Sequence, residues 1–206
     1  MPDPYVMRRM IAEEQAEFGE MLRGLTEQQW EAPTLCTNWS VHELVIHIAI
    51  HTHGTDVARQ ITAARRGFTI DRVHAPERAR KKEELIDWLE SPAVDASTFN
   101  LKTQLSELII HQQDVRRPLG IPRTIPEERL APVLDNAVTN LGSLAVVQTL
   151  KKTKGLRLIA TDIDWSVGAG PEVRGPGEAI FMALAGRAPA LDDLEGDGTT
   201  KLRMRL

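Results

Sequence analysis

Residues 35–47 read Leu-Cys-Thr-Asn-Trp-Ser-Val-His-Glu-Leu-Val-Ile-His, and residues 107–111 read Glu-Leu-Ile-Ile-His. In the first stretch, Ser40 and Glu43 form the S-x-x-E pattern that caps the start of a helix. This pattern predicts a helix from Ser40 to about Arg66. The second stretch also lies in a helical pattern, so two predicted helices carry histidines and a carboxylate among apolar residues.

Further helices extend outward from these two stretches. The second one belongs to a helical pattern over residues 100–117, which we expect to end before Pro118. Apolar residues at spacings of three and four predict another helix over residues 6–25 and a fourth over residues 126–150, with a short helix around residues 85–89. Four long helices on short loops indicate an up-and-down bundle.

The last part of the chain differs in character. Residues 156–167 include alternating stretches, residues 168–177 contain four glycines, and residues 201–206 alternate charged residues with Leu or Met, a pattern typical of strands. A helix is predicted over residues 177–186. The sequence therefore predicts an α+β protein with a helical domain over residues 1–150 and a small α+β domain over residues 151–206.

Composition excludes several classes of protein. The 206 residues are 42% hydrophobic and 26% charged, as in folded globular proteins. A net charge of −4 and an aromatic content of 4% argue against nucleic-acid binding. Cys36 is the one cysteine, so no disulfide can form within the chain. Because no signal-peptide pattern and no apolar run of membrane-spanning length occur, we expect a cytoplasmic protein without a membrane partner.

The histidines suggest a metal site. His47 and His51 are four residues apart, as are Glu107 and His111, and residues four apart share one face of a helix. Two histidines and a carboxylate from facing helices are typical of a catalytic divalent metal that keeps an open position. Spacing alone also fits a solvated helix face or a histidine packed in the core, and both alternatives stay open at this point.

Longer strings are more specific. Residues 35–47 resemble the C-x-x-W-[ST]-v-x-(D/E)-(L/V)-x-x-H segment of the actinobacterial mycothiol-dependent maleylpyruvate isomerase family, and residues 107–120 resemble its second signature. The tail, through residues 156–162, 175–177 and 185–187, is similar to the family's C-terminal domain, which resembles sterol carrier proteins. The resemblance implies a DinB-like helical bundle in the N-terminal domain. It also implies a divalent metal, with zinc as our first expectation, held by His47, Glu107 and His111.

Other residues have open roles. His51 is a partner of the ligands, a proton shuttle or a packed residue, and Asp114 either orients a ligand imidazole or forms a salt bridge to Arg117 or a cap. Cys36 is expected to be a packed thiol rather than a nucleophile. Arg187 is a candidate for gripping a substrate carboxylate, because guanidinium offers two parallel donors, or it is a surface residue.

The resemblance implies a metal-dependent thiol transferase or isomerase. In this interpretation the metal activates mycothiol, a low-molecular-weight thiol, for attack on a small electrophilic substrate. Two alternatives remain: a metal-stabilised binding protein or carrier of a small apolar ligand, and a hydrolase that uses metal-bound water. The sequence does not identify the electrophile, the native metal or the oligomeric state.

Overall fold

The computed structural model describes residues 3–52, 74–92, 101–139, 149 and 151–206. These form two compact units, Met1–Pro122 and Arg123–Leu206. The predicted domains meet at residue 150 instead, and that assignment stays a prediction. The predicted extension of the second helix to Arg66 lies outside the described residues. No helix in the described part of the chain is long and apolar enough to cross a membrane.

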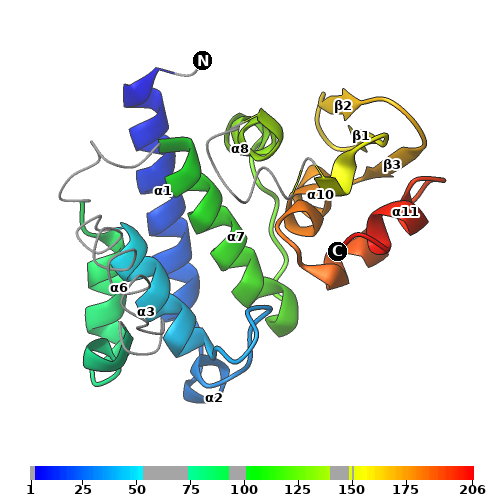
Figure 1. The fold of residues 1–206 in the computed structure, drawn as a ribbon. Coiled ribbons are helices and arrows are strands. Elements are labelled where there is room, and N and C mark those ends of the chain that lie inside the picture. Colours follow the sequence, from blue (N-terminus) through cyan, green and yellow to red (C-terminus); the bar gives the residue numbers. More distant parts are fainter. Residues whose placement is uncertain (1–2, 53–73, 93–100, 140–148, 150) are drawn as a thin grey trace, which may run out of the picture. The chain divides into compact units, whose positions relative to one another are not determined.

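The first unit contains a four-helix bundle (Figure 1). Helix α1 packs against α6 and α7, and α3 packs against the same two helices. The bundle is confirmed, and the short α6 is one of its four helices. Helix α8 (Glu127–Thr139), at the start of the predicted helix over residues 126–150, belongs to the second unit. The bounds are α1 Pro4–Arg23, α2 Glu27–Trp30, α3 Val41–Thr52, η1 Ala75–Glu77, α6 Lys82–Glu90 and α7 Leu101–Leu119.

Local sequence explains where the helices begin. The side chain of Asp3 accepts a hydrogen bond from the amide of Tyr5 at 2.8 Å, and Pro4 occupies the first turn of α1, where its missing N–H costs nothing. The predicted cap of α3 is present, because Ser40 Oγ accepts a hydrogen bond from the amide of Glu43 at 3.3 Å.

Among the described residues, the core of the bundle consists mainly of aliphatic side chains together with Phe18. Its fully buried side chains come from all four helices and follow the helical spacing seen in the sequence. They include Phe18, Leu22, Leu44, Ile48, Leu85, Leu89, Leu105 and Leu108. This core fixes the faces of α3 and α7 and thereby the direction of the polar residues between the apolar ones.

Helix α7 continues through Pro118 instead of ending before it. Proline has no N–H, so Pro118 cannot bond the carbonyl of Asp114 one turn earlier. The amide of Leu35 donates to that carbonyl instead, at 3.1 Å. The loop before α3 is thereby attached to α7 one residue from Cys36.

The second unit combines helices with a small sheet. Strand β1 lies in the centre, antiparallel to β2 and parallel to β3. Helix α10 confirms the helix predicted over residues 177–186. Helix α8 packs against it. The bounds are α8 Glu127–Thr139, β1 Arg157–Ala160, β2 Ser166–Gly168, β3 Glu172–Gly175, α10 Gly177–Leu184, η2 Ala188–Asp193 and α11 Thr199–Arg203.

The end of the chain is helical, so the strand-like interpretation of residues 201–206 was wrong. The free edge of β3 is already paired, because Arg174 and Glu195 exchange two backbone hydrogen bonds of 2.8 Å. Residues 199–203 form α11 instead and bury Leu202.

Replacing Asp162 by alanine should destabilise the second unit. Asp162 Oδ1 accepts a hydrogen bond of 2.7 Å from the amide of Gly177, the first residue of α10. Loss of such a helix-start acceptor costs about 1 kcal/mol, which lowers the melting temperature of a unit of this size by about 4–8 °C. Thermal unfolding followed by circular dichroism measures the change. The exposed Asp164 provides the matched control, and an equal change in Asp164→Ala would contradict the capping role.

Candidate metal centre

Three predicted ligands converge inside the bundle. One ligand atom each from His47, Glu107 and His111 lies within 4.8 Å of the other two. Helix α3 supplies His47 and α7 supplies the other two residues, so the packing of α3 against α7 creates the cluster. His47 and His111 are buried, whereas the side chain of Glu107 is 30% exposed. The cluster is therefore enclosed on the histidine side and accessible beside the carboxylate.

Asp114 and Glu107 hold the His111 ring from opposite sides. Nδ1 of His111 is 3.0 Å from Asp114 Oδ2, and Nε2 is 3.3 Å from Glu107 Oε2. Asp114 is fully buried and lies one turn after His111 on α7. Of the alternatives that the sequence left open for Asp114, the structure shows the contact that orients the imidazole.

Cys36 contacts this group as well. It is half-buried, its Sγ donates to Asp114 Oδ2 at 3.1 Å, and Sγ lies 3.8 Å from His111 Nδ1. The attachment of Leu35 to the carbonyl of Asp114 explains this position. Cys36, His111 and Asp114 also form a group of close ligand atoms, which shares His111 with the first cluster. The thiol supports the buried carboxylate that orients His111.

Two further histidines adjoin His47. The ring centre of His51 is 5.5 Å away, and Nε2 of the fully buried His74 is 3.3 Å from His47 Nδ1. The Trp39 ring covers both His47 and His74, with centroid distances of 4.6 and 5.3 Å. Sequence analysis missed His74, because it is 27 residues from His47 and belongs to no helical pattern with it.

The charges of the three ligands suit a cation. Burial lowers the pKa of His47 to about 3, with help from nearby histidines, so its imidazole is neutral. Burial alone would raise the pKa of Glu107, but the hydrogen bond and charge of His111 outweigh it and lower the pKa to about 2. Burial alone would lower the pKa of His111, but its bonds to Asp114, Cys36 and Glu107 raise it well above the ordinary value. A bound divalent ion would take the place of the proton on His111.

The donor set fits zinc or a similar divalent metal. Two imidazoles and one carboxylate are the protein ligands of many catalytic zinc sites, with one position left for water or substrate. Zinc bonds of about 2 Å place ligand atoms within about 4 Å of one another. The observed limit of 4.8 Å therefore requires small side-chain adjustments only.

Arg187 lies in the second compact unit, immediately before η2. Its Nη1 donates to the carbonyl of Ala185 at 2.9 Å. Burial, followed by the charge of Arg187, lowers the pKa of Lys152. The contact of Arg187 with a substrate carboxylate stays a prediction.

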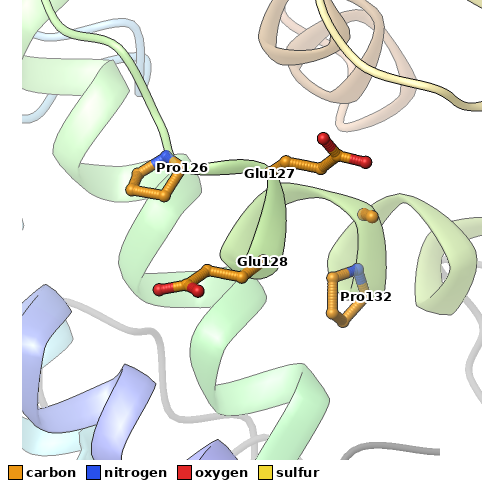
Figure 2. Close-up of a pocket in the computed structure, with 5 residues that line it drawn as sticks. Pro126, Glu127, Glu128 and Pro132 are labelled. Carbon is orange, nitrogen blue, oxygen red and sulfur yellow. The ribbon is translucent and has the colours of Figure 1, made fainter.

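A surface hollow in the second unit lies at the start of α8. Figure 2 shows the carboxylates of Glu127 and Glu128 pointing in different directions there. The hollow is lined by Pro126, Glu127, Glu128, Ala131 and Pro132, and it contains neither histidine nor cysteine. It provides no arrangement comparable to the histidine cluster.

Comparison with known proteins agrees with this picture. Residues 11–99 match the family model of the mycothiol maleylpyruvate isomerase N-terminal domain. The fold is similar to crystal structures of the mycothiol-dependent maleylpyruvate isomerase and of a histidine-to-alanine mutant of it. Both have a TM-score of 0.65, 15% and 14% identity respectively, and cover 96% of this chain and 94% of theirs. No curated protein sequence matches significantly.

The chain thus has the mostly helical α+β fold of these solved structures, with a histidine–carboxylate cluster between two bundle helices. The predicted resemblance to the mycothiol-dependent maleylpyruvate isomerase family is confirmed, by the sequence of residues 11–99 and by the fold of nearly the whole chain. The matched solved structures are those of an enzyme, and the activity of this chain itself is a proposal.

Proposed function

We propose that this chain is a metal-dependent, mycothiol-dependent thiol transferase or isomerase that acts on a small electrophile. The observation that carries the proposal is the convergence of His47, Glu107 and His111 on one point of the bundle. The similarity to mycothiol-dependent maleylpyruvate isomerase is the reason for proposing mycothiol as the thiol. Zinc is the metal that we propose for the donor set.

A divalent metal held by these residues supplies Lewis acidity, which favours the thiolate form of a thiol. His47 would provide a neutral donor from the buried side, as would His111 once the metal takes the place of its proton. Glu107 would provide a negative charge at the accessible side of the cluster. Asp114 fixes the orientation of His111. Arg187 is proposed to bind a carboxylate of the substrate.

Two reactions follow from a thiolate and an electrophilic carbon. Addition to an activated double bond forms a carbon–sulfur bond, and elimination of the unchanged thiol after bond rotation gives isomerisation. Displacement of a leaving group gives a thioether and releases that group with the bonding electrons. In both reactions the chain itself contributes no sulfur, which agrees with the hydrogen bond that Cys36 donates to Asp114.

Turnover with a thiol tests the proposal. Zinc-loaded protein is mixed with mycothiol and, in separate assays, maleylpyruvate and 1-chloro-2,4-dinitrobenzene, and product formation is followed by absorbance. We expect turnover that requires both zinc and mycothiol and that disappears in Glu107→Gln. Hydrolysis of ester substrates without thiol would favour the hydrolase instead. Zinc-dependent stability with no turnover of either electrophile would favour a structural metal.

Replacing Asp114 by asparagine should weaken zinc binding by about 10–100-fold, as is typical when a partner of a ligand histidine is lost. Asparagine keeps the size of the side chain but removes the charge that faces His111 Nδ1 and Cys36 Sγ. Competition with a fluorescent zinc chelator measures the affinity. Asp87→Asn changes an exposed carboxylate on α6 and should leave the affinity unaltered. Equal affinities of the two variants would contradict the role of Asp114.

A further inference from the structure

Both ligand histidines are contacted at Nδ1. Asp114 lies 3.0 Å from Nδ1 of His111, and His74 Nε2 lies 3.3 Å from Nδ1 of His47. In His111 the remaining nitrogen, Nε2, faces Glu107 at 3.3 Å. Each imidazole therefore has a buried partner at Nδ1, so that Nε2 is the nitrogen left for a metal. The partner is a carboxylate on one side and an imidazole on the other.

Tautomers give the His47–His74 contact a direction. A neutral imidazole has one N–H donor and one acceptor nitrogen. If Nε2 of His47 binds a metal, its proton is on Nδ1 and is donated to His74. His74 must then accept at Nε2 and carry its own proton on Nδ1. One contact thus sets the tautomers of both rings.

We propose that His74 is a positioning residue that holds His47 as the Nδ1–H tautomer, with Nε2 directed to the metal. Its contribution to metal binding rests on the proposed metal centre, whereas its control of the His47 tautomer does not. The fully buried position of His74 shields the contact from competing water. The Trp39 ring, which packs on both imidazoles, restricts their rotation.

The tautomer is measurable without any metal. Long-range ¹H–¹⁵N correlation spectra of metal-free, ¹⁵N-labelled protein distinguish a protonated Nδ1 from a protonated Nε2, and His47→Gln assigns the signals. We expect Nδ1–H for His47 in the wild type and loss of this preference in His74→Leu. A wild-type His47 with its proton on Nε2 overturns the proposal, even if zinc binds normally.

Two matched variants separate positioning from packing. Glutamine at position 74 can place its amide oxygen where Nε2 of the imidazole was, whereas asparagine is one methylene shorter and cannot reach. Both are polar and neutral in the same buried position. We therefore expect His74→Gln to retain the His47 tautomer and most of the zinc affinity, and His74→Asn to lose both.

Zinc affinity, measured by chelator competition, gives the second readout. We expect His74→Leu and His74→Asn to bind zinc about 10–100-fold more weakly than the wild type. The control is His42→Gln, which changes another α3 histidine that contacts Trp30 and Arg80. Unchanged zinc affinity in His74→Asn overturns the positioning role. A loss of zinc binding as complete as in His47→Ala also overturns it, and would make His74 a ligand.

The spectra distinguish failure of this inference from failure of the proposed function. Wild-type protein that binds no zinc but shows the His74-dependent Nδ1–H tautomer contradicts the metal centre and supports the positioning. Protein that binds zinc but whose His47 tautomer is the same without His74 supports the metal centre and contradicts the positioning role of His74. Circular dichroism of each variant at the assay temperature confirms that it is folded.

Discussion

His111→Ala should lose the bound metal, about one equivalent in the wild type. The variant leaves two predicted ligands, His47 and Glu107, and removes the ring that Asp114 and Glu107 hold between them. Two ligands provide less than the three-residue set of a catalytic zinc site. Elemental analysis of protein purified without chelators or a polyhistidine tag measures the metal content, and Glu107→Ala should lose the metal as well.

The control is His51→Ala. The ring of His51 lies 5.5 Å from that of His47, but His51 is outside the group of three converging ligand atoms. We expect this variant to retain the metal. Full metal content in His111→Ala would contradict the site, and loss in His51→Ala would add a fourth ligand to it. A wild type that takes up no zinc, manganese, nickel or iron would leave the carrier as the better interpretation.

Phe18→Ala should lower the free energy of unfolding by about 3–5 kcal/mol, the usual cost of removing a buried aromatic ring. The Phe18 side chain has no exposed surface, and it belongs to the α1 face that packs in the bundle. Such a loss is a large part of the about 5–15 kcal/mol that stabilises a typical domain. Unfolding in urea, followed by tryptophan fluorescence, measures it.

Tyr5→Ala provides the control on the same helix. Tyr5 is 78% exposed, and exposed substitutions change stability by about 0.5 kcal/mol or less. The pair separates loss of core packing from loss of an aromatic residue in α1. Similar denaturation midpoints for the two variants would show that the Phe18 position does not contribute to the core as described.

Part of the candidate site could be predicted from the sequence, because helical periodicity places residues four apart on one face. This reasoning brought Glu107 and His111 together, and the longer string selected His47 over His51. Periodicity does not show which helices pack together. The short pattern around residues 85–89 was therefore not assigned to the bundle, although α6 packs there against α1 and α3.

Contacts between distant segments were beyond the sequence. His74, which immediately precedes η1, contacts His47 across 27 residues of sequence, and Cys36 contacts Asp114 from a loop across 78 residues. No repeat or spacing encodes such pairs. The neighbours Leu35 and Trp39 predicted that the Cys36 thiol is packed among apolar residues. Its contact with the buried carboxylate of Asp114 is visible only in the structure.

Pro118 links helix stability to the order of the site. An alanine there would restore an N–H and could strengthen the last turn of α7, yet that N–H would compete with Leu35 for the Asp114 carbonyl. The substitution would thus stabilise the end of α7 and weaken the attachment of the loop that carries Cys36. Hydrogen exchange of the Leu35 amide measures this effect: the amide should exchange slowly in the wild type and faster in Pro118→Ala. The proline, usually a defect within a helix, here makes an acceptor available for tethering a loop.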